Sequence, residues 1–135
     1  MTAMTELASA PLFAGLPEAE LKEIAASFKE VHHPPGTEIT VGGATGVGFM
    51  VVGEGELEVL LPGRTRRLGP GAAFGEMALL DSERRRSATV RTTTEVTLHI
   101  LPVWEFKPFL ADHPEVSYRM LQHLSRRLRE VEGSS

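Results

Sequence analysis

The chain has 135 residues, of which 41% are apolar and 24% are charged, and its formal net charge is −4. This balance gives no general attraction to nucleic acids or anionic membranes, and the lack of cysteine excludes disulfides and thiolate metal ligands. The apolar runs are far shorter than the roughly 20 residues of a membrane span, and the N-terminus lacks the features of a signal peptide. We therefore expect a cytoplasmic protein with a single domain over residues 1–135.

Helical and strand patterns follow one another along the chain. Pro17 suits the first position of a helix, and apolar residues at helical spacing continue to Phe28, so we expect one amphipathic helix to open the domain. From Val31 to about Leu101 the chain breaks into short β-branched runs separated by glycine and proline, with turns about every 8–12 residues. This pattern predicts a small all-β sandwich, jelly roll or barrel. Within it, the alternation of residues 56–59 predicts a strand with one wet face near a sheet edge.

The last third of the chain returns to a helical pattern. We expect a short helix around Trp104 to Leu110, with Trp104 packed at the end of the roll, and a longer helix from about Pro114 to Val131. The longer helix has an apolar stripe that could pack on the domain, form a homodimer seam, or both. The members of this stripe are Leu121, Leu124, Leu128 and Val131. The arginines of "RRLRE" beside it are expected on a solvated face.

The stretch "FGEMALL", residues 74–80, does not fit the strand pattern. It contains good helix formers after a turn, which predicts a short helix that interrupts the sheet. The first N–H groups of this helix, from Gly75 to Ala78, would have no intrahelical partner and could bind an anion. Glu76 would suit a ligand that has a sugar hydroxyl beside its phosphate, because a carboxylate is a strong hydrogen-bond acceptor.

The loop that follows supplies a second group for the same anion. Arg86 could reach it with two parallel N–H bonds, the geometry that favours arginine over lysine. Ser87 and Ala88 are small, so their backbone groups could approach the anion without a side-chain clash. One acid and one arginine would then contact two ends of one small molecule.

These residues resemble the phosphate-binding cassette of cyclic nucleotide-binding domains. The matching stretch is "GAAFGEMALLDSERRRSATV", and the resemblance extends over about residues 12–131 through "LFAGLP", "FMVVGEGELEV", "LGPG" and "FLADHPEV". The resemblance implies a fold that is mainly β with flanking α, an eight-stranded β-roll (double-stranded jelly roll). It also implies an N-terminal helix, a short phosphate-binding helix and C-terminal helices. The core of the domain would span about residues 12–131.

The resemblance also implies a ligand, cyclic AMP or cyclic GMP, and a set of residues that bind it. Members of the family have an acidic residue that accepts a hydrogen bond from the ribose 2′-hydroxyl, and this residue corresponds to Glu76. The family's phosphate-binding arginine corresponds to Arg86. Members that prefer cyclic GMP often carry threonine where this chain has Ser87, so the resemblance favours cyclic AMP. Val131 stands where regulators of the catabolite activator type have a threonine that contacts adenine. The implied ligand-binding residues are Gly75, Glu76, Met77, Ala78, Arg86, Ser87 and Ala88.

The expected function is that of a non-catalytic sensor or regulatory module, with no cofactor beyond the cyclic nucleotide. The alternative is a degenerate β-roll that acts as a protein-interaction or dimerisation module without a ligand. An enzyme, either a metal-dependent cupin or a cyclic nucleotide phosphodiesterase, is disfavoured because no base and nucleophile arrangement surrounds the anion site.

The histidines do not form a recognisable metal-binding pattern. His32 and His33 would point to opposite faces of a strand, and His99, His113 and His123 supply no third ligand at a usual spacing. We therefore expect no metal site. The expected partners are an unknown protein effector and a second copy of the chain through the C-terminal helix, with no nucleic acid and no membrane.

Overall fold

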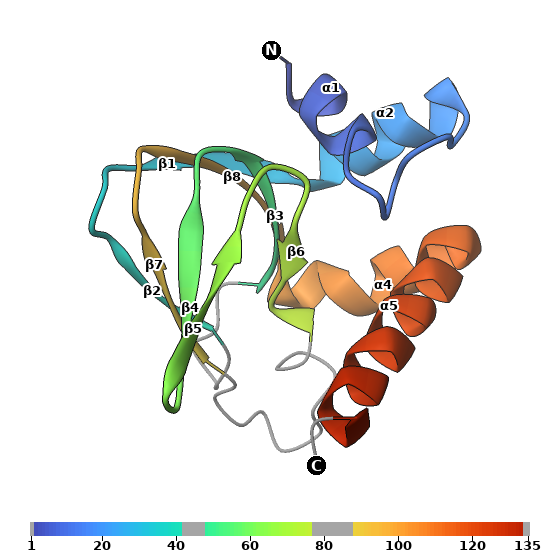
Figure 1. Ribbon diagram of the computed structural model, residues 1–135. Coiled ribbons are helices and arrows are strands. Elements are labelled where there is room, and N and C mark those ends of the chain that lie inside the picture. The colour runs from blue at the N-terminus through green and yellow to red at the C-terminus, as the bar shows by residue number, and fades with distance from the viewer. Residues whose placement is uncertain (1, 42–47, 77–87, 134–135) are drawn as a thin grey trace.

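The computed structural model describes residues 2–41, 48–76 and 88–133, in which two β-sheets lie beside a group of helices (Figure 1). The helices are α1 (Ala3–Ala8), α2 (Glu18–Ser27), α4 (Val103–Asp112) and α5 (Pro114–Gly133). The strands are β1 (Lys29–His33), β2 (Glu38–Val41), β3 (Gly48–Glu54), β4 (Leu57–Leu61), β5 (Arg64–Leu68), β6 (Ala73–Phe74), β7 (Ala88–Thr92) and β8 (Val96–Pro102). None of these helices is both long enough and apolar enough to span a bilayer.

Each sheet has four strands, in the orders β1-β8-β3-β6 and β2-β7-β4-β5. The strand pairs are antiparallel, and the chain passes repeatedly from one sheet to the other, which is the topology of a jelly roll. With eight strands among the described residues and helices beside them, the predicted β-roll is confirmed. The predicted wet-faced strand is β4, which lies next to the edge strand β5. Residues 77–80 of the predicted phosphate-binding helix, 74–80, lie outside the described residues.

The sheet that contains β3 is buried on both faces. Phe49 and Val51 belong to the core between this sheet and the helices, whereas Met50 and Val52 belong to the core between the two sheets. Successive side chains of a strand point to opposite faces, so a strand buried on both faces must be apolar at every position. This requirement explains why "FMVV" shows no alternation of apolar and polar residues.

Aromatic rings connect the helices to the roll. The ring of Phe28 lies 5.9 Å from that of Phe13 and 5.8 Å from that of Phe109, in edge-to-face arrangements. Phe49 on β3 lies 5.8 Å from Phe106 on α4. Ring pairs at such distances add about 0.5–1.5 kcal/mol each beyond their burial. The cluster therefore fixes α4 and the end of α2 against the sheet.

The N-terminal region contains one helix more than we expected. The predicted helix is α2, which begins after Pro17 and has Glu18 and Glu20 in its first turn. The expectation that this helix opens the domain is wrong, because α1 precedes it. α1 has only 6 residues and would be marginal alone, so its stability depends on packing such as the burial of Leu7.

The two C-terminal helices are confirmed, but some of their side chains lie in other surroundings than we expected. α5 buries Val116 and Met120 against the domain, whereas Leu121 and Leu128 are 64% and 59% exposed. Leu124, another member of the predicted stripe, packs against the core that contains Val116 and Met120, so the stripe only partly coincides with the face that packs on the roll. Trp104 is 73% exposed, so it is a surface residue and not a packing residue at the end of the roll.

Candidate functional site

The candidate site begins where β6 ends, at Gly75 and Glu76. Gly75 has a φ of 98°, and a Cβ atom there would lie 2.7 Å from the carbonyl oxygen of Gly48. A side chain at this position would be both strained and in collision with backbone. The glycine therefore permits a close turn against β3, after which Glu76 points into the interior.

Glu76 is a buried acid that contacts α5. It is 1% exposed, and its Oε1 atom lies 3.2 Å from Nη1 of Arg127, which donates a hydrogen bond to it. The same oxygen lies 3.4 Å from Nε2 of His123. A buried carboxylate is costly unless it is paired, so the Arg127 guanidinium explains how Glu76 is tolerated in the interior.

Two buried polar atoms at this point have no hydrogen-bond partner among the described residues. They are the second carboxylate oxygen of Glu76, Oε2, and Nε2 of His123. Most buried polar atoms in native proteins are hydrogen-bonded, so each exception needs a reason. An open carboxylate oxygen is an acceptor for a hydroxyl donor, and a ligand hydroxyl would satisfy it.

Glu76 lines a cavity of about 320 Å³ between α5, the segment that follows α1 and the segment that leads into β6. This volume is at the lower end of the range for small-molecule sites. Phe49 and Met120 give the cavity an apolar wall, and Gln122, His123 and Arg126 on α5 add polar groups. The described lining residues are Pro11, Leu12, Phe49, Gly71, Ala72, Ala73, Glu76, Arg119, Met120, Gln122, His123 and Arg126.

Arg119 connects two walls of this cavity. Its Nη1 atom donates to the carbonyl oxygens of Ala14 at 2.7 Å and Leu12 at 3.2 Å, and its Nε atom donates to Glu115 at 3.2 Å. Since its donors are engaged in this way, Arg119 positions α5 relative to residues 11–14. It is therefore a structural clamp at the cavity wall.

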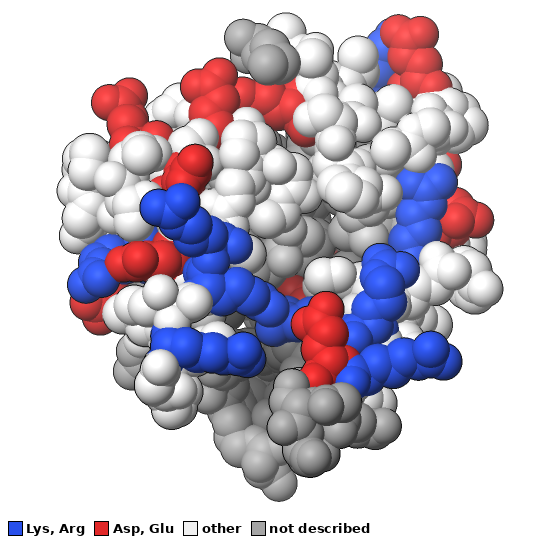
Figure 2. All heavy atoms as spheres, in the orientation of Figure 1, with Lys and Arg blue, Asp and Glu red and all other residues white. Residues whose placement is uncertain are grey.

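Positive charge gathers around Glu76. Figure 2 shows lysine and arginine side chains around a hollow on this face, from the strand side across to α5. Arg66 on β5 interacts electrostatically with Glu76 and Arg127: burial lowers the pKa of its guanidinium, the Arg127 cation lowers that pKa further, and Glu130 and Glu76 raise it. Its Nε atom is also buried without a partner among the described residues. The neighbourhood is therefore suited to an anionic ligand.

The structure tests only part of the predicted site. Glu76 lines the cavity, Gly75 directly precedes it in the chain, and the backbone of Ala88 begins β7. Met77, Ala78, Arg86 and Ser87 lie outside the described residues. The side chains of Ala88 and Val131 are also outside the description.

Sequence reasoning missed two residues of this site, His123 and Arg127. We expected the arginines of "RRLRE" on a solvated face, and for Arg127 this is wrong because it binds the buried Glu76. The two residues are four apart on α5, so they lie on one side of the helix. That spacing was a usable signal, but the sequence does not show which side of α5 faces the roll.

The sequence of the roll also matches known proteins. The family model described as "Cyclic nucleotide-binding domain" matches residues 30–113. A cyclic nucleotide-gated potassium channel from Mesorhizobium japonicum is 39% identical over 111 residues, which cover 82% of this chain and 31% of the channel. The cyclic AMP receptor protein of Thermus thermophilus is 33% identical over 128 residues, which cover 90% of this chain and 59% of that protein.

The fold has a counterpart among solved structures. The crystal structure of the Thermus thermophilus catabolite activator protein matches with a TM-score of 0.80 and 32% identity, over 93% of this chain and 61% of that one. This chain spans less than two thirds of each of these relatives. The jelly roll, the helices that flank it and the cavity beside its C-terminal helix define the class as a β-roll domain with a pocket of small-molecule size. Within this class, the chain belongs to the cyclic nucleotide-binding domain family.

Proposed function

We propose that this domain binds a 3′,5′-cyclic mononucleotide, cyclic AMP in preference to cyclic GMP, and acts as a sensor without a catalytic step. The observation that carries the proposal is the buried Glu76, whose Oε2 atom has no hydrogen-bond partner among the described residues. A ribose 2′-hydroxyl is the donor that this oxygen lacks. The preference for cyclic AMP is supported by the similarity to a cyclic AMP receptor protein and by the presence of Ser87.

The other contacts come from the family resemblance. Arg86 would bind the cyclic phosphate, because a guanidinium offers two parallel donors to phosphate oxygens. Backbone groups of the proposed ligand-binding residues at positions 75, 77, 78, 87 and 88 would surround the same phosphate. The base would lie toward α5, whose side chains Gln122 and Arg126 line the cavity.

α5 would report the bound ligand to the rest of the protein. Arg127 and His123 of this helix contact the same carboxylate that we assign to the ribose. A ligand hydroxyl on Oε2 of Glu76 therefore acts directly on the carboxylate whose other oxygen holds α5. Only a difference in affinity between two positions of the helix can shift its equilibrium, and such coupling is typically about 1–3 kcal/mol.

A competitive titration with cyclic AMP, cyclic GMP and linear 5′-AMP tests the function. We expect saturable binding of cyclic AMP, weaker binding of cyclic GMP and the weakest binding of linear AMP. Cyclic AMP at about 100 times its dissociation constant should add about 2.7 kcal/mol to the free energy of unfolding. If no 3′,5′-cyclic nucleotide binds at millimolar concentration, the proposal is wrong. Accumulation of 5′-AMP from cyclic AMP during the incubation would contradict the non-catalytic role.

A second role, dimerisation through α5, is favoured by its exposed apolar side chains. Tyr118 is 59% exposed, and Leu121 and Leu128 are similarly exposed and seven residues apart on the same side of the helix. This spacing is that of a helix–helix seam. The dimer could serve as the output of the sensor, or it could be the whole function if the pocket does not bind a nucleotide. In the latter case the oligomeric state would not respond to cyclic AMP.

A further inference from the structure

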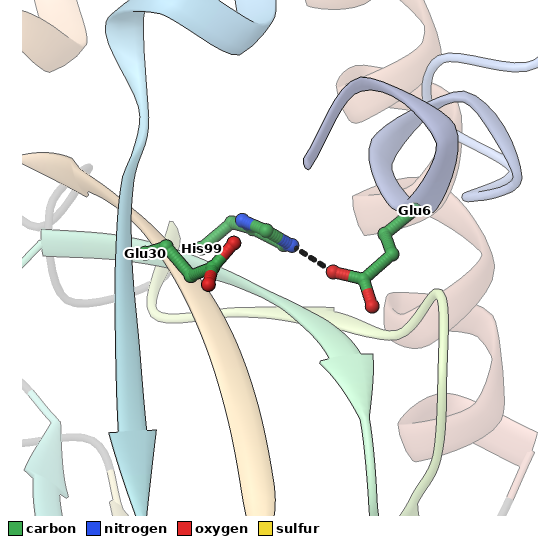
Figure 3. A group of neighbouring side chains, drawn as sticks. All are labelled: Glu6, Glu30 and His99. Atoms are coloured by element: carbon green, nitrogen blue, oxygen red, sulfur yellow. Dashed lines mark hydrogen bonds and ion pairs between the residues drawn. The ribbon is translucent and has the colours of Figure 1, made fainter. Parts of the chain in front are cut away.

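Three side chains of metal-ligating type meet outside the nucleotide cavity (Figure 3). They are Glu6 of α1, Glu30 of β1 and His99 of β8, and one potential ligand atom of each lies within 4.8 Å of the other two. None of the three lines the cavity that contains Glu76. The proposed nucleotide site gives them no role, so their arrangement needs a separate explanation.

The sheet register brings two of these residues together. Glu30 and His99 are direct partners in the antiparallel ladder of β1 and β8. Side chains of such partners lie on the same face, with Cβ atoms about 4.5–5.5 Å apart. Their neighbours Val31 and Leu98 point to the opposite face and contribute to the core between the sheets. Glu30 and His99 therefore both face the side of the sheet that α1 covers.

Glu6 of α1 is the third member of the group and contacts His99 from the helical side of the sheet. Its Oε1 atom lies 2.7 Å from Nε2 of His99, as the dashed line in Figure 3 marks. The side chains of His99 and Glu6 are only 1% and 4% exposed, whereas that of Glu30 is 43% exposed. The group thus has a buried imidazole, a buried carboxylate and a second carboxylate that is partly exposed. An ion could reach the group from solvent on the side of Glu30.

A glycine keeps the space beside the buried pair free of side chains. The β3–β8 ladder shifts register between Val52 and Glu54, which makes Gly53 part of a β-bulge. A Cβ atom at Gly53 would lie 2.5 Å from Oε1 of Glu6 and 2.8 Å from Nε2 of His99. Bulges often occur beside functional sites, where they redirect the strand. Here the bulge places bare backbone next to two ligand atoms.

Glu30 is itself held in place by neighbouring side chains. Its Oε2 atom lies 2.9 Å from Nε2 of His32, and Nδ1 of His32 lies 3.1 Å from Oγ1 of Thr97. Outer partners of this kind orient the ligands of metal sites. The exposed carboxylate is therefore positioned on the open side of the buried pair.

We propose that Glu6, Glu30 and His99 bind one divalent cation of the Zn²⁺ class. One imidazole nitrogen and two carboxylate oxygens are ligands that Zn²⁺ accepts, with a water molecule in the fourth position. Mg²⁺ and Ca²⁺ prefer six or more oxygen ligands and fit this set poorly. Two ligands at about 2.0–2.1 Å from a tetrahedral ion lie about 3.3 Å apart. The ion would displace the proton between Glu6 and His99, which is released to solvent, and would widen their 2.7 Å contact by about 0.6 Å.

The ion would attach α1 to the sheet. α1 has 6 residues and depends on packing, so a bond from Glu6 to an ion shared with β1 and β8 would stabilise its docked position. This role departs from our expectation that the chain has no metal site. The spacing of histidines along the sequence does not indicate that a carboxylate of a distant helix lies beside His99.

The test is a titration of the full, tag-free, metal-stripped chain with Zn²⁺ in competition with a chromophoric chelator. We expect one Zn²⁺ ion to bind tightly per chain. Glu30→Gln should lower the Zn²⁺ affinity by at least about tenfold, since even residues that only hydrogen-bond to metal ligands typically contribute that much. Glu38→Gln removes another exposed strand glutamate, on the other sheet, and should leave the affinity unchanged. Zn²⁺ should also slow hydrogen exchange of residues 3–8 in the parent and in Glu38→Gln, but much less in Glu30→Gln.

A second variant addresses the buried pair. Glu6→Gln keeps a hydrogen-bonding group beside His99 but removes the charge, and circular dichroism melting without metal shows whether it folds. If this variant is folded, it should no longer bind the one tight Zn²⁺ ion. Absence of 1:1 binding in the parent, or equal Zn²⁺ affinity in Glu30→Gln and the parent, would overturn the proposal. Neither result bears on the nucleotide site, whose own titration with cyclic AMP is made without metal.

Discussion

Replacement of Glu76 by glutamine tests the role of the buried carboxylate. Arg127 binds the Oε1 atom of Glu76, whereas Oε2 has no partner among the described residues. A ribose 2′-hydroxyl can therefore bind Oε2 without displacing the arginine. Hydrogen bonds to charged groups contribute about 1.5–3 kcal/mol. We expect Glu76→Gln to weaken cyclic AMP binding by about 2 kcal/mol, which is about 30-fold in the dissociation constant.

The ligand supplies the control for this prediction. 2′-Deoxy cyclic AMP lacks the hydroxyl, so it should bind the parent about as weakly as cyclic AMP binds Glu76→Gln, and the substitution should affect it little. Isothermal titration calorimetry on both proteins with both ligands completes a double-mutant cycle. Its coupling energy measures the interaction between the Glu76 carboxylate and the ribose 2′-hydroxyl. Glu23→Gln, which alters an exposed acid of α2, away from the described lining of the cavity, should bind both ligands like the parent. A coupling energy near zero, with both proteins folded, would refute the assignment of Glu76 to the ribose.

Three further changes test other parts of the structure and the proposed function. Arg86→Ala should weaken cyclic AMP binding by roughly 2–4 kcal/mol, since it removes a charge-assisted contact to the phosphate, and unchanged affinity in calorimetry would exclude Arg86 from the site. Gly75→Ala should lower the free energy of unfolding by at least about 1–3 kcal/mol, because φ at this position is 98° and a Cβ atom would meet the carbonyl of Gly48. Urea unfolding measures this loss. Gly63 also has a positive φ, but a Cβ atom there would meet no atom within 4 Å, so Gly63→Ala measures the backbone strain without the steric clash. Leu128→Glu should convert a dimer into monomers in analytical ultracentrifugation without loss of cyclic AMP binding, and a parent that is monomeric at all concentrations would contradict the α5 seam.

Sequence patterns predicted the elements whose cause is local. Pro17 and the acids that follow it mark the start of α2, and glycines and prolines between β-branched runs mark the strands of the roll. The "FMVV" run has no alternation, yet it forms β3 because both faces of that sheet are buried. Local rules were sufficient here because each segment had one favourable conformation.

Local patterns did not predict which surfaces meet. α1 is too short to give a clear helical signal and depends on contacts of Leu7 and Glu6 with distant strands. On α5 the apolar residues lie on more than one side, so the stripe through Leu121 and Leu128 could not be distinguished from the face of Val116 and Met120 that packs on the roll.

The candidate site shows the same limit. The position of Glu76 in a pocket was inferred from a motif, but its contacts come from the opposite end of the chain. Arg127 lies 51 residues away in sequence, and no local pattern indicates which residue of α5 will reach a carboxylate at that distance. Charged residues of a helix are usually solvated, so the sequence pattern predicts a solvated position for Arg127. Only the packing of α5 on the roll reveals its contact.

A crystal structure of this chain with cyclic AMP would test the proposed binding mode directly. We expect one nucleotide per chain in the cavity beside α5, its ribose 2′-oxygen within hydrogen-bonding distance of Glu76 and its phosphate facing Arg86. If the nucleotide occupied another surface, or if the Glu76 carboxylate contacted only α5 while the ribose lay elsewhere, the binding mode that we infer would be wrong.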